Sequence, residues 1–97
     1  MDSTAAAEQY KDYDIFVYSA TYCPFCTRAK TTAQNASSNV GIYELDTEAD
    51  GDSVRSILSS KFNHHTVPMV FVKGEFIGGN SELQALKSSG SLASKLA

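Results

Sequence analysis

The sequence predicts an α/β fold in which a four-stranded mixed β-sheet is flanked by helices on both faces. Residues 15–19 form a continuous apolar run of strand length, and its lack of polar alternation is typical of a central strand covered on both faces. Strand-like and helical segments then alternate as far as residue 62, the order of a parallel strand–helix–strand unit. Two further strand-like runs, 69–72 and 75–79, are separated by two residues and therefore predict an antiparallel hairpin.

Two helices are predicted in the first third of the chain. Residues 4–12 contain three consecutive alanines, which favour a short opening helix. Pro24 suits the first position of a second helix, residues 24–36, because its φ is already helical and its missing N–H is not needed there. One narrow face of that helix carries only small residues, which allow close packing on a sheet: Cys26, Ala29, Ala33 and Ala36.

The remainder of the chain adds a strand, two helices and a final turn. Residues 40–46 predict the second strand, and an amphipathic helix follows the turn at 50–52. Ser81 followed by Gln84 fits a capping box that opens the next helix, which Gly90 interrupts. The apolar residues expected to face the core here, including a last turn at the C-terminal end, are Val54, Ile57, Leu58, Phe62, Leu83, Leu86, Leu92 and Leu96.

Length and composition limit the possible function classes. A chain of 97 residues has the size of one domain, so residues 1–97 are predicted to form a single domain. The net charge of -3 and the scattered lysines and arginines argue against a nucleic-acid partner. No apolar run approaches the ~20 residues that span a bilayer, and the first residues lack a secretory signal pattern. These features predict a cytoplasmic protein without a membrane partner.

The only two cysteines, Cys23 and Cys26, lie at the start of the helix that follows the buried strand. Such a pair in a chain without a secretory signal favours redox or metal chemistry over a disulfide scaffold. Unpaired N–H groups and the helix dipole stabilise a thiolate at Cys23, and Arg28 and Lys30 add positive charge nearby. Cys26, one turn later, is close enough for a disulfide. We therefore expect Cys23 to be the attacking thiolate and Cys26 the resolving thiol.

A metal site is a weaker interpretation of the cysteine pair. Tetrahedral zinc requires four ligands, and the additional candidates are His64 and His65, whose adjacent positions do not match the usual ligand spacing. A metal ion or iron–sulfur cluster shared between two chains remains open at this stage, as does an inert pair. The redox interpretation explains the pair best.

Three motifs together resemble the dithiol glutaredoxins of the thioredoxin-like superfamily. C-P-F-C at 23–26 follows the first strand, T-V-P at 66–68 precedes the third, and G-G at 78–79 ends the fourth. The likeness covers nearly the whole chain, with the motifs in order. Thioredoxins are a poorer match, because the tryptophan and the Gly-Pro pair around their cysteines are absent. The resemblance implies a thioredoxin-like fold in which Pro68 is a cis-proline facing the cysteines.

The resemblance also implies a glutathione site. In this family, the backbone beside the cis-proline holds the extended tripeptide, and the helix that follows the glycine pair receives the γ-glutamyl end. A polar residue on the third helix commonly holds the glycyl carboxylate. Carried over to this sequence, the implied glutathione-binding residues are Phe25, Arg55, Thr66, Val67, Pro68, Gly79, Asn80 and Ser81.

Three features of the sequence depart from the family pattern. Ala20 stands where a lysine often precedes the cysteines, and Asn80 stands where an additional cysteine would follow the glycine pair. His64 and His65 replace the polar or arginine residues usual before T-V-P. A histidine near the site would make activity pH-dependent, whereas the alternative is an ordinary surface pair.

The implied function is that of a glutathione-dependent thiol–disulfide oxidoreductase, which reduces protein disulfides and protein–glutathione mixed disulfides through Cys23 and Cys26. Glutathione or a related thiol is the expected co-substrate, and disulfide-containing or glutathionylated proteins are the expected partners. The chain is expected to be a monomer with no metal or flavin. Two alternatives remain open: a thioredoxin-like reductant that does not use glutathione, and a dimer that carries a glutathione-ligated iron–sulfur cluster.

Overall fold

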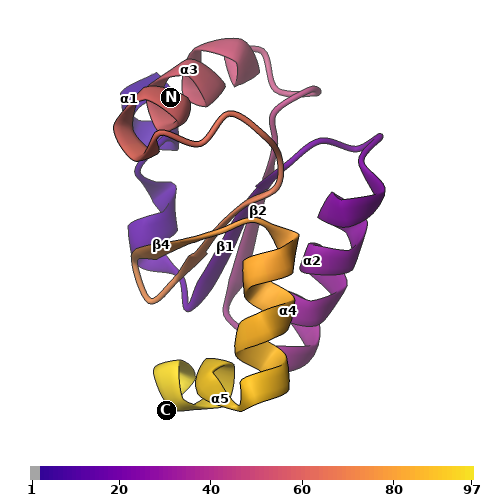
Figure 1. Cartoon of the computed structure of the whole chain (residues 1–97). Coiled ribbons are helices and arrows are strands. Elements are labelled where there is room, and N and C mark those ends of the chain that lie inside the picture. The colour runs from indigo at the N-terminus through magenta and orange to yellow at the C-terminus, as the bar shows by residue number, and fades with distance from the viewer. Residues whose placement is uncertain (1–2) are drawn as a thin grey trace.

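The computed structural model describes residues 3–97 and shows the predicted mixed sheet (Figure 1). The strand order is β2-β1-β3-β4, with β1 parallel to β2 and antiparallel to β3, and β3 antiparallel to β4. The predicted fold class is therefore confirmed. The four strands are β1 (Ile15–Ser19), β2 (Val40–Glu44), β3 (Met69–Val72) and β4 (Glu75–Gly78).

Helices cover both faces of this sheet (Figure 1). One face carries α2 (Pro24–Ala36), α4 (Asn80–Ser89) and α5 (Ser91–Leu96), and the other carries α1 (Ser3–Ala6), the 3-10 helix η1 (Gln9–Asp12) and α3 (Gly51–Phe62). The central strand β1 supplies both cores, because successive side chains of a strand point to opposite faces. Phe16 and Tyr18 pack with α1 and α3, whereas Ile15 and Val17 pack with α2 and α4.

The predicted helix over residues 4–12 is wrong as a continuous element, since α1 and η1 are separated by a turn. The buried hydroxyl of Tyr18 donates a hydrogen bond of 2.7 Å to the carbonyl of Ala6, at the point where the helix ends. The turn brings Ala6, Ala7 and Tyr10 into the same core cluster. A tertiary contact with the sheet thus overrides the local helix preference of the alanines.

Two boundaries on the α2 side of the sheet also differ from the prediction. Strand β2 ends at Glu44 instead of residue 46, because the chain turns at Asp46, whose carboxylate accepts hydrogen bonds from Thr21. Ala36, expected on the packed face of α2, is exposed at the last turn of that helix. The packed face is otherwise as predicted, with Cys26, Ala29 and Ala33 fully buried.

The start of α4 was also predicted incorrectly. The helix begins at Asn80, with Gly79 as its N-cap, and the carboxylate of Glu82 accepts a hydrogen bond of 2.6 Å from the backbone N–H of Gly79. Glu82 therefore completes the capping arrangement expected of Gln84. The amide of Gln84 instead donates to Thr32 on α2, at 2.8 Å, and ties the two helices together.

The sheet topology brings three distant segments to one edge. Strand β1 ends where β3 begins, since these strands are antiparallel, and β4 ends beside the same point for the same reason. The segments that follow β1, precede β3 and follow β4 are those that carry Cys23, Pro68 and Gly79. Within residues 3–97, no helix is long and apolar enough to cross a membrane.

Candidate active site

Cys23 is the N-cap residue of α2, as predicted. Pro24 follows at the first helical position, and the backbone N–H of Cys26 donates to the Cys23 sulfur at 3.3 Å. The Cys23 side chain is partly exposed, and its sulfur lies 3.9 Å from the carbonyl oxygen of Val67, to which the thiol form can donate. A thiolate at this position is stabilised by the N–H group of Cys26 and by the helix dipole.

Cys26 lies directly behind Cys23 and has no exposed surface. Its sulfur accepts a hydrogen bond of 3.5 Å from the backbone N–H of Ala20. Burial, together with the hydrogen bond to Cys23, raises the pKa of the Cys26 thiol to about 12, while the backbone N–H of Ala20 and, to a lesser extent, the charge of Lys30 oppose this effect. Cys26 is therefore a thiol at rest, which suits a residue that acts after Cys23.

A partly buried ion pair accompanies Cys26 on the same side of the sheet. Lys30, one helical turn after Cys26, places its ammonium 2.8 Å from the carboxylate of Glu44, and the two side chains are only 19% and 23% exposed. The buried hydroxyl of Ser19 donates to the other carboxylate oxygen of Glu44. Arg28 is exposed on the outer side of α2. Of the two basic residues noted in the sequence, Lys30 is thus held in an ion pair one turn from Cys26, whereas Arg28 is exposed to solvent.

The T-V-P segment faces the cysteines, and the Val67–Pro68 peptide bond is cis, as the resemblance implied. Beside it lies a pocket of about 360 Å³ that extends to the start of α4. The pocket joins three segments that the sheet topology brings together. Its lining residues are Phe25, His64, Thr66, Val67, Pro68, Gly79, Asn80, Ser81 and Glu82.

Seven of the eight residues expected to bind glutathione line this pocket, and Arg55 does not. Arg55 lies partly buried on α3. Two lining residues, His64 and Glu82, were not among those assigned to the site. Their sequence positions, two residues before T-V-P and three after Gly79, were the available signals.

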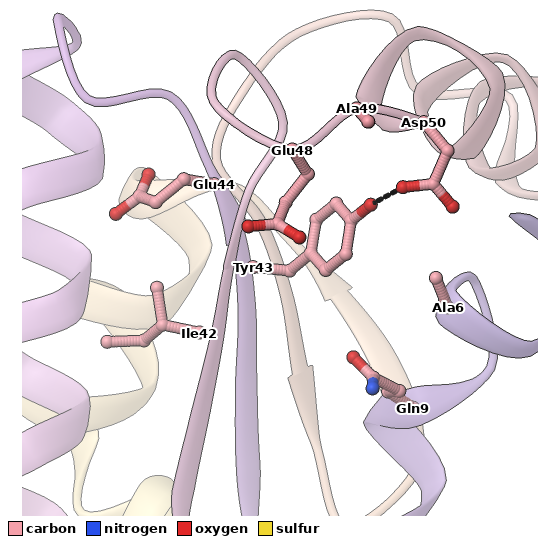
Figure 2. Close-up of a pocket in the computed structure, with 8 residues that line it drawn as sticks. All are labelled: Ala6, Gln9, Ile42, Tyr43, Glu44, Glu48, Ala49 and Asp50. Carbon is pink, nitrogen blue, oxygen red and sulfur yellow. Dashed lines mark hydrogen bonds between the residues drawn. The ribbon is translucent and has the colours of Figure 1, made fainter. Parts of the chain in front are cut away.

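A larger hollow of about 610 Å³ lies elsewhere, between α1, η1 and the chain that follows β2 (Figure 2). Tyr43 points across it and donates a hydrogen bond to the carboxylate of Asp50. Glu48 adds negative charge beside Asp50, whereas the carboxylate of Glu44 points away from Tyr43 and pairs with Lys30 (Figure 2). The lining contains neither cysteine. This hollow is acidic and therefore unsuited to an anionic tripeptide. Among residues 3–97, no three His, Cys, Asp or Glu side chains cluster closely enough to hold a metal ion.

A C-x-x-C pair at a helix N-terminus, opposite a cis-proline and on a mixed sheet of this order, defines a thiol–disulfide oxidoreductase of the thioredoxin-like superfamily. The comparisons with known proteins identify the family within it. The glutaredoxin family model matches residues 15–77. Glutaredoxin-2 of Schizosaccharomyces pombe is 41% identical over 83 residues, which cover 86% of this chain and 76% of that protein.

Comparison with solved structures identifies the same family. The dithiolic glutaredoxin 2-C-Grx1 of Trypanosoma brucei brucei superposes with a TM-score of 0.87 and 32% identity, covering 94% of both chains. A buckwheat glutaredoxin–glutathione complex superposes with a TM-score of 0.88 and 31% identity, covering 97% of this chain and 86% of that one. The chain belongs to the glutaredoxin family. It is a glutathione-dependent thiol–disulfide oxidoreductase.

Proposed function

We propose that Cys23 is the nucleophile of this activity and Cys26 its resolving thiol. The observation that carries the proposal is the contrast between the two sulfurs. Cys23 is partly exposed, and its sulfur accepts a hydrogen bond from the backbone N–H of Cys26 at the start of α2. Cys26, in contrast, is fully buried and its thiol has a raised pKa. An incoming disulfide can therefore reach Cys23 but not Cys26.

The glutathione route uses Cys23 alone. Its thiolate attacks the glutathione sulfur of a protein–glutathione mixed disulfide, forming a Cys23–glutathione disulfide, while the protein thiolate leaves and takes a proton from water. A second glutathione thiolate then attacks the glutathione sulfur of this intermediate. Glutathione disulfide leaves, and the Cys23 thiolate is restored. One glutathione molecule and the glutathione unit of the substrate have joined into one disulfide, and the mixed disulfide of the substrate has been reduced to a protein thiol.

The route for protein disulfides requires both cysteines. Attack by Cys23 on a protein disulfide forms a mixed disulfide and releases one substrate thiolate. Cys26 attacks the Cys23 sulfur and passes its proton to a released substrate thiolate, so that the second substrate sulfur leaves and a Cys23–Cys26 disulfide forms. Two glutathione molecules then reduce this internal disulfide. The spacing of one helical turn supports the step, because the Cys26 N–H already contacts the Cys23 sulfur.

We place glutathione in the pocket beside Pro68. The backbone of Val67 can pair with the extended tripeptide, flanked by Thr66, while the ring of Phe25, which is 58% exposed, forms an apolar wall. The N–H groups at the start of α4, at Asn80 and Ser81 beyond Gly79, suit a carboxylate. Arg55 is retained as a candidate for the glycyl carboxylate, on the family resemblance alone.

We further propose that residues 1–97 act as one domain, as a monomer, on disulfide-containing and glutathionylated proteins. The exposed rings of Tyr22 and Phe25 beside Cys23 provide an apolar contact for such substrates. A cytoplasmic site of action would suit a dithiol that must be kept reduced. Analytical ultracentrifugation and cell fractionation test the monomeric state and the compartment.

Glutathione-coupled reduction of a small mixed disulfide tests the assigned roles. We expect activity in the wild type, loss of at least about a thousandfold in Cys23→Ser, and retention within about threefold in Cys26→Ser. An insulin-type protein disulfide should instead require both cysteines. Equal loss in the two variants with the small substrate would contradict the assignment. Turnover by a thioredoxin reductase without glutathione would favour the thioredoxin-like alternative.

A further inference from the structure

His64 contributes an imidazole to the proposed glutathione pocket. The side chain is partly buried, and its ring packs edge-on against Phe76, with ring centroids 5.2 Å apart. Its Nε2 atom lies 3.2 Å from the hydroxyl of Thr66 and would lie 3.9 Å from a Cβ atom built on Gly79. The imidazole therefore reaches from the T-V-P segment to the N-terminus of α4, where a carboxylate is expected.

The charge of the lining residues makes the His64 side chain important for binding an anion. Glu82 is the one acidic residue in the lining, which contains no lysine or arginine. Glutathione carries two carboxylates and one ammonium group, so it is an anion as well. Arg55 does not line the pocket, and Ala20 replaces the lysine that the family often has. Among the lining residues, His64 is the one side chain that can become a cation.

Charged groups on the elements packed around His64 are directed elsewhere. Lys61, in the last turn of α3, places its ammonium 5.5 Å from the ring centroid of Phe62. Glu75, on the strand of Phe76, pairs with Lys95 at 2.9 Å. His65 follows His64 in the chain but is exposed and does not line the pocket. Among the residues that line the pocket, the other titratable group is therefore Glu82, from α4. The Cys23 sulfur is outside the lining and lies 3.9 Å from the carbonyl oxygen of Val67.

We propose that His64 makes glutathione binding pH-dependent by supplying the cationic group that holds a glutathione carboxylate at the start of α4. When protonated, the imidazole donates a charge-assisted hydrogen bond toward the carboxylate. When neutral, the imidazole accepts a hydrogen bond from the Thr66 hydroxyl, and the pocket keeps the net negative charge of Glu82. This inference rests on the proposed glutathione site and assigns a binding role to a residue outside the set implied by the resemblance.

The expected effect follows from one positive charge gained beside the glutathione carboxylate when the imidazole is protonated. Between about pH 8 and about pH 5.5, affinity for glutathione should increase about three- to tenfold, the size of a partly exposed charge-assisted contact. In His64→Gln, which keeps a hydrogen-bonding side chain without the charge, affinity should be independent of pH over this range. His65→Gln should behave as the wild type, because that side chain lies outside the pocket.

NMR titration of the reduced protein with S-methylglutathione tests the inference. This probe lacks a thiol, so neither redox chemistry nor thiol titration of the ligand contributes. Dissociation constants are measured at about pH 5.5, 6.5 and 8 for the wild type, His64→Gln and His65→Gln. The amide spectra also report whether each variant is folded. The inference is supported if only His64→Gln loses the pH dependence.

Two other outcomes overturn it in different ways. Binding that is independent of pH in the wild type, or equally pH-dependent in His64→Gln, rejects the role of His64 and leaves the glutathione site intact. Absence of binding in all three proteins, together with absence of glutathione-coupled activity, rejects the proposed site as well. The coupled assay of the wild type therefore separates the two failures.

Discussion

Cys23 and Cys26 have the same side chain and lie three residues apart, yet their surroundings are opposite. Cys23 precedes the first turn of α2 and is partly exposed, and its sulfur accepts a hydrogen bond from the backbone N–H of Cys26. Cys26 shares the buried face of α2 with Ala29 and Ala33 and has no exposed surface. Less than one turn of helix thus separates an accessible thiol, the proposed nucleophile, from a buried thiol, the proposed resolving residue.

The difference teaches that position on the helix, and not residue type, assigns the two roles. Pro24 places the helix start directly after Cys23, so the unpaired N–H groups of the first turn surround that sulfur. The helical period then directs Cys26 inward, where burial raises its pKa to about 12. The following predictions test this comparison, from the largest expected effect to the smallest.

Alkylation should show the contrast most strongly. At neutral pH, iodoacetamide should modify Cys23 at least about a hundredfold faster than Cys26, because Cys26 is inaccessible and its raised pKa leaves it protonated. Peptide mapping by mass spectrometry over time measures both rates. In guanidinium chloride the two rates should agree within about threefold. Similar rates in the folded protein would remove the basis of the comparison.

Lys30→Met should slow the route that uses the buried Cys26 thiol more than the glutathione route. Lys30 opposes the effect of burial on the pKa of Cys26, so its loss should slow protein-disulfide reduction about three- to tenfold while the glutathione route changes less than about twofold. Arg28→Met is the matched control, since Arg28 is exposed on the same helix, and it should affect neither route. Equal slowing of both routes by Lys30→Met would point to a general structural defect, which denaturant unfolding would reveal.

Gly78, the last residue of β4, and Gly79, the N-cap of α4, test the accessible side of the comparison, where glutathione is proposed to bind. A Cβ on Gly79 would make ordinary contacts of 3.4–3.9 Å but extend into the pocket, so Gly79→Ala should raise the KM for glutathione about three- to fivefold with little loss of stability. Gly78 has a φ of 116°, and a Cβ there would lie 2.6 Å from Glu82. Gly78→Ala should therefore lower the free energy of unfolding by about 1–3 kcal/mol. Unchanged KM in Gly79→Ala would exclude this wall from the glutathione site.

Asp46→Asn should have the smallest effect. The Asp46 carboxylate accepts hydrogen bonds from the N–H and hydroxyl of Thr21, which precedes the cysteines, and these bonds lower its pKa. The resulting stability is present above the unfolded pKa of about 3.9 and is lost as the pH falls through the lowered folded pKa. The stability difference between wild type and variant, measured by urea unfolding, should therefore narrow in acid. A difference that widens in acid would contradict this role.

The elements governed by local chemistry were predictable from the sequence. Pro24 located the start of α2, the apolar run located β1, and the two-residue turn located the hairpin, where Lys73 and Gly74 both have positive φ. The dithiol could be placed for the same reason, since its position relative to Pro24 is fixed within the chain. Each of these features depends on residues that are close together in the sequence.

Features that depend on tertiary contacts were not predictable. His64 and His65 are equivalent in the sequence, and packing against Phe76 places one of them in the pocket. Arg55 was carried over from the family as the polar residue of the third helix, but it does not line the pocket. The capping role of Glu82 depends on the helix beginning at Asn80, a shift of a residue or two that a capping motif alone does not resolve.

The most direct test of the division between the two cysteines is to trap the first covalent intermediate. Cys26→Ser and Cys23→Ser are each treated with glutathione disulfide, quenched in acid and analysed by intact mass and peptide mapping. Our account predicts one glutathione on Cys23 in Cys26→Ser, released by excess glutathione, and none on Cys26 in Cys23→Ser. Glutathione on Cys26 at a comparable rate would contradict it.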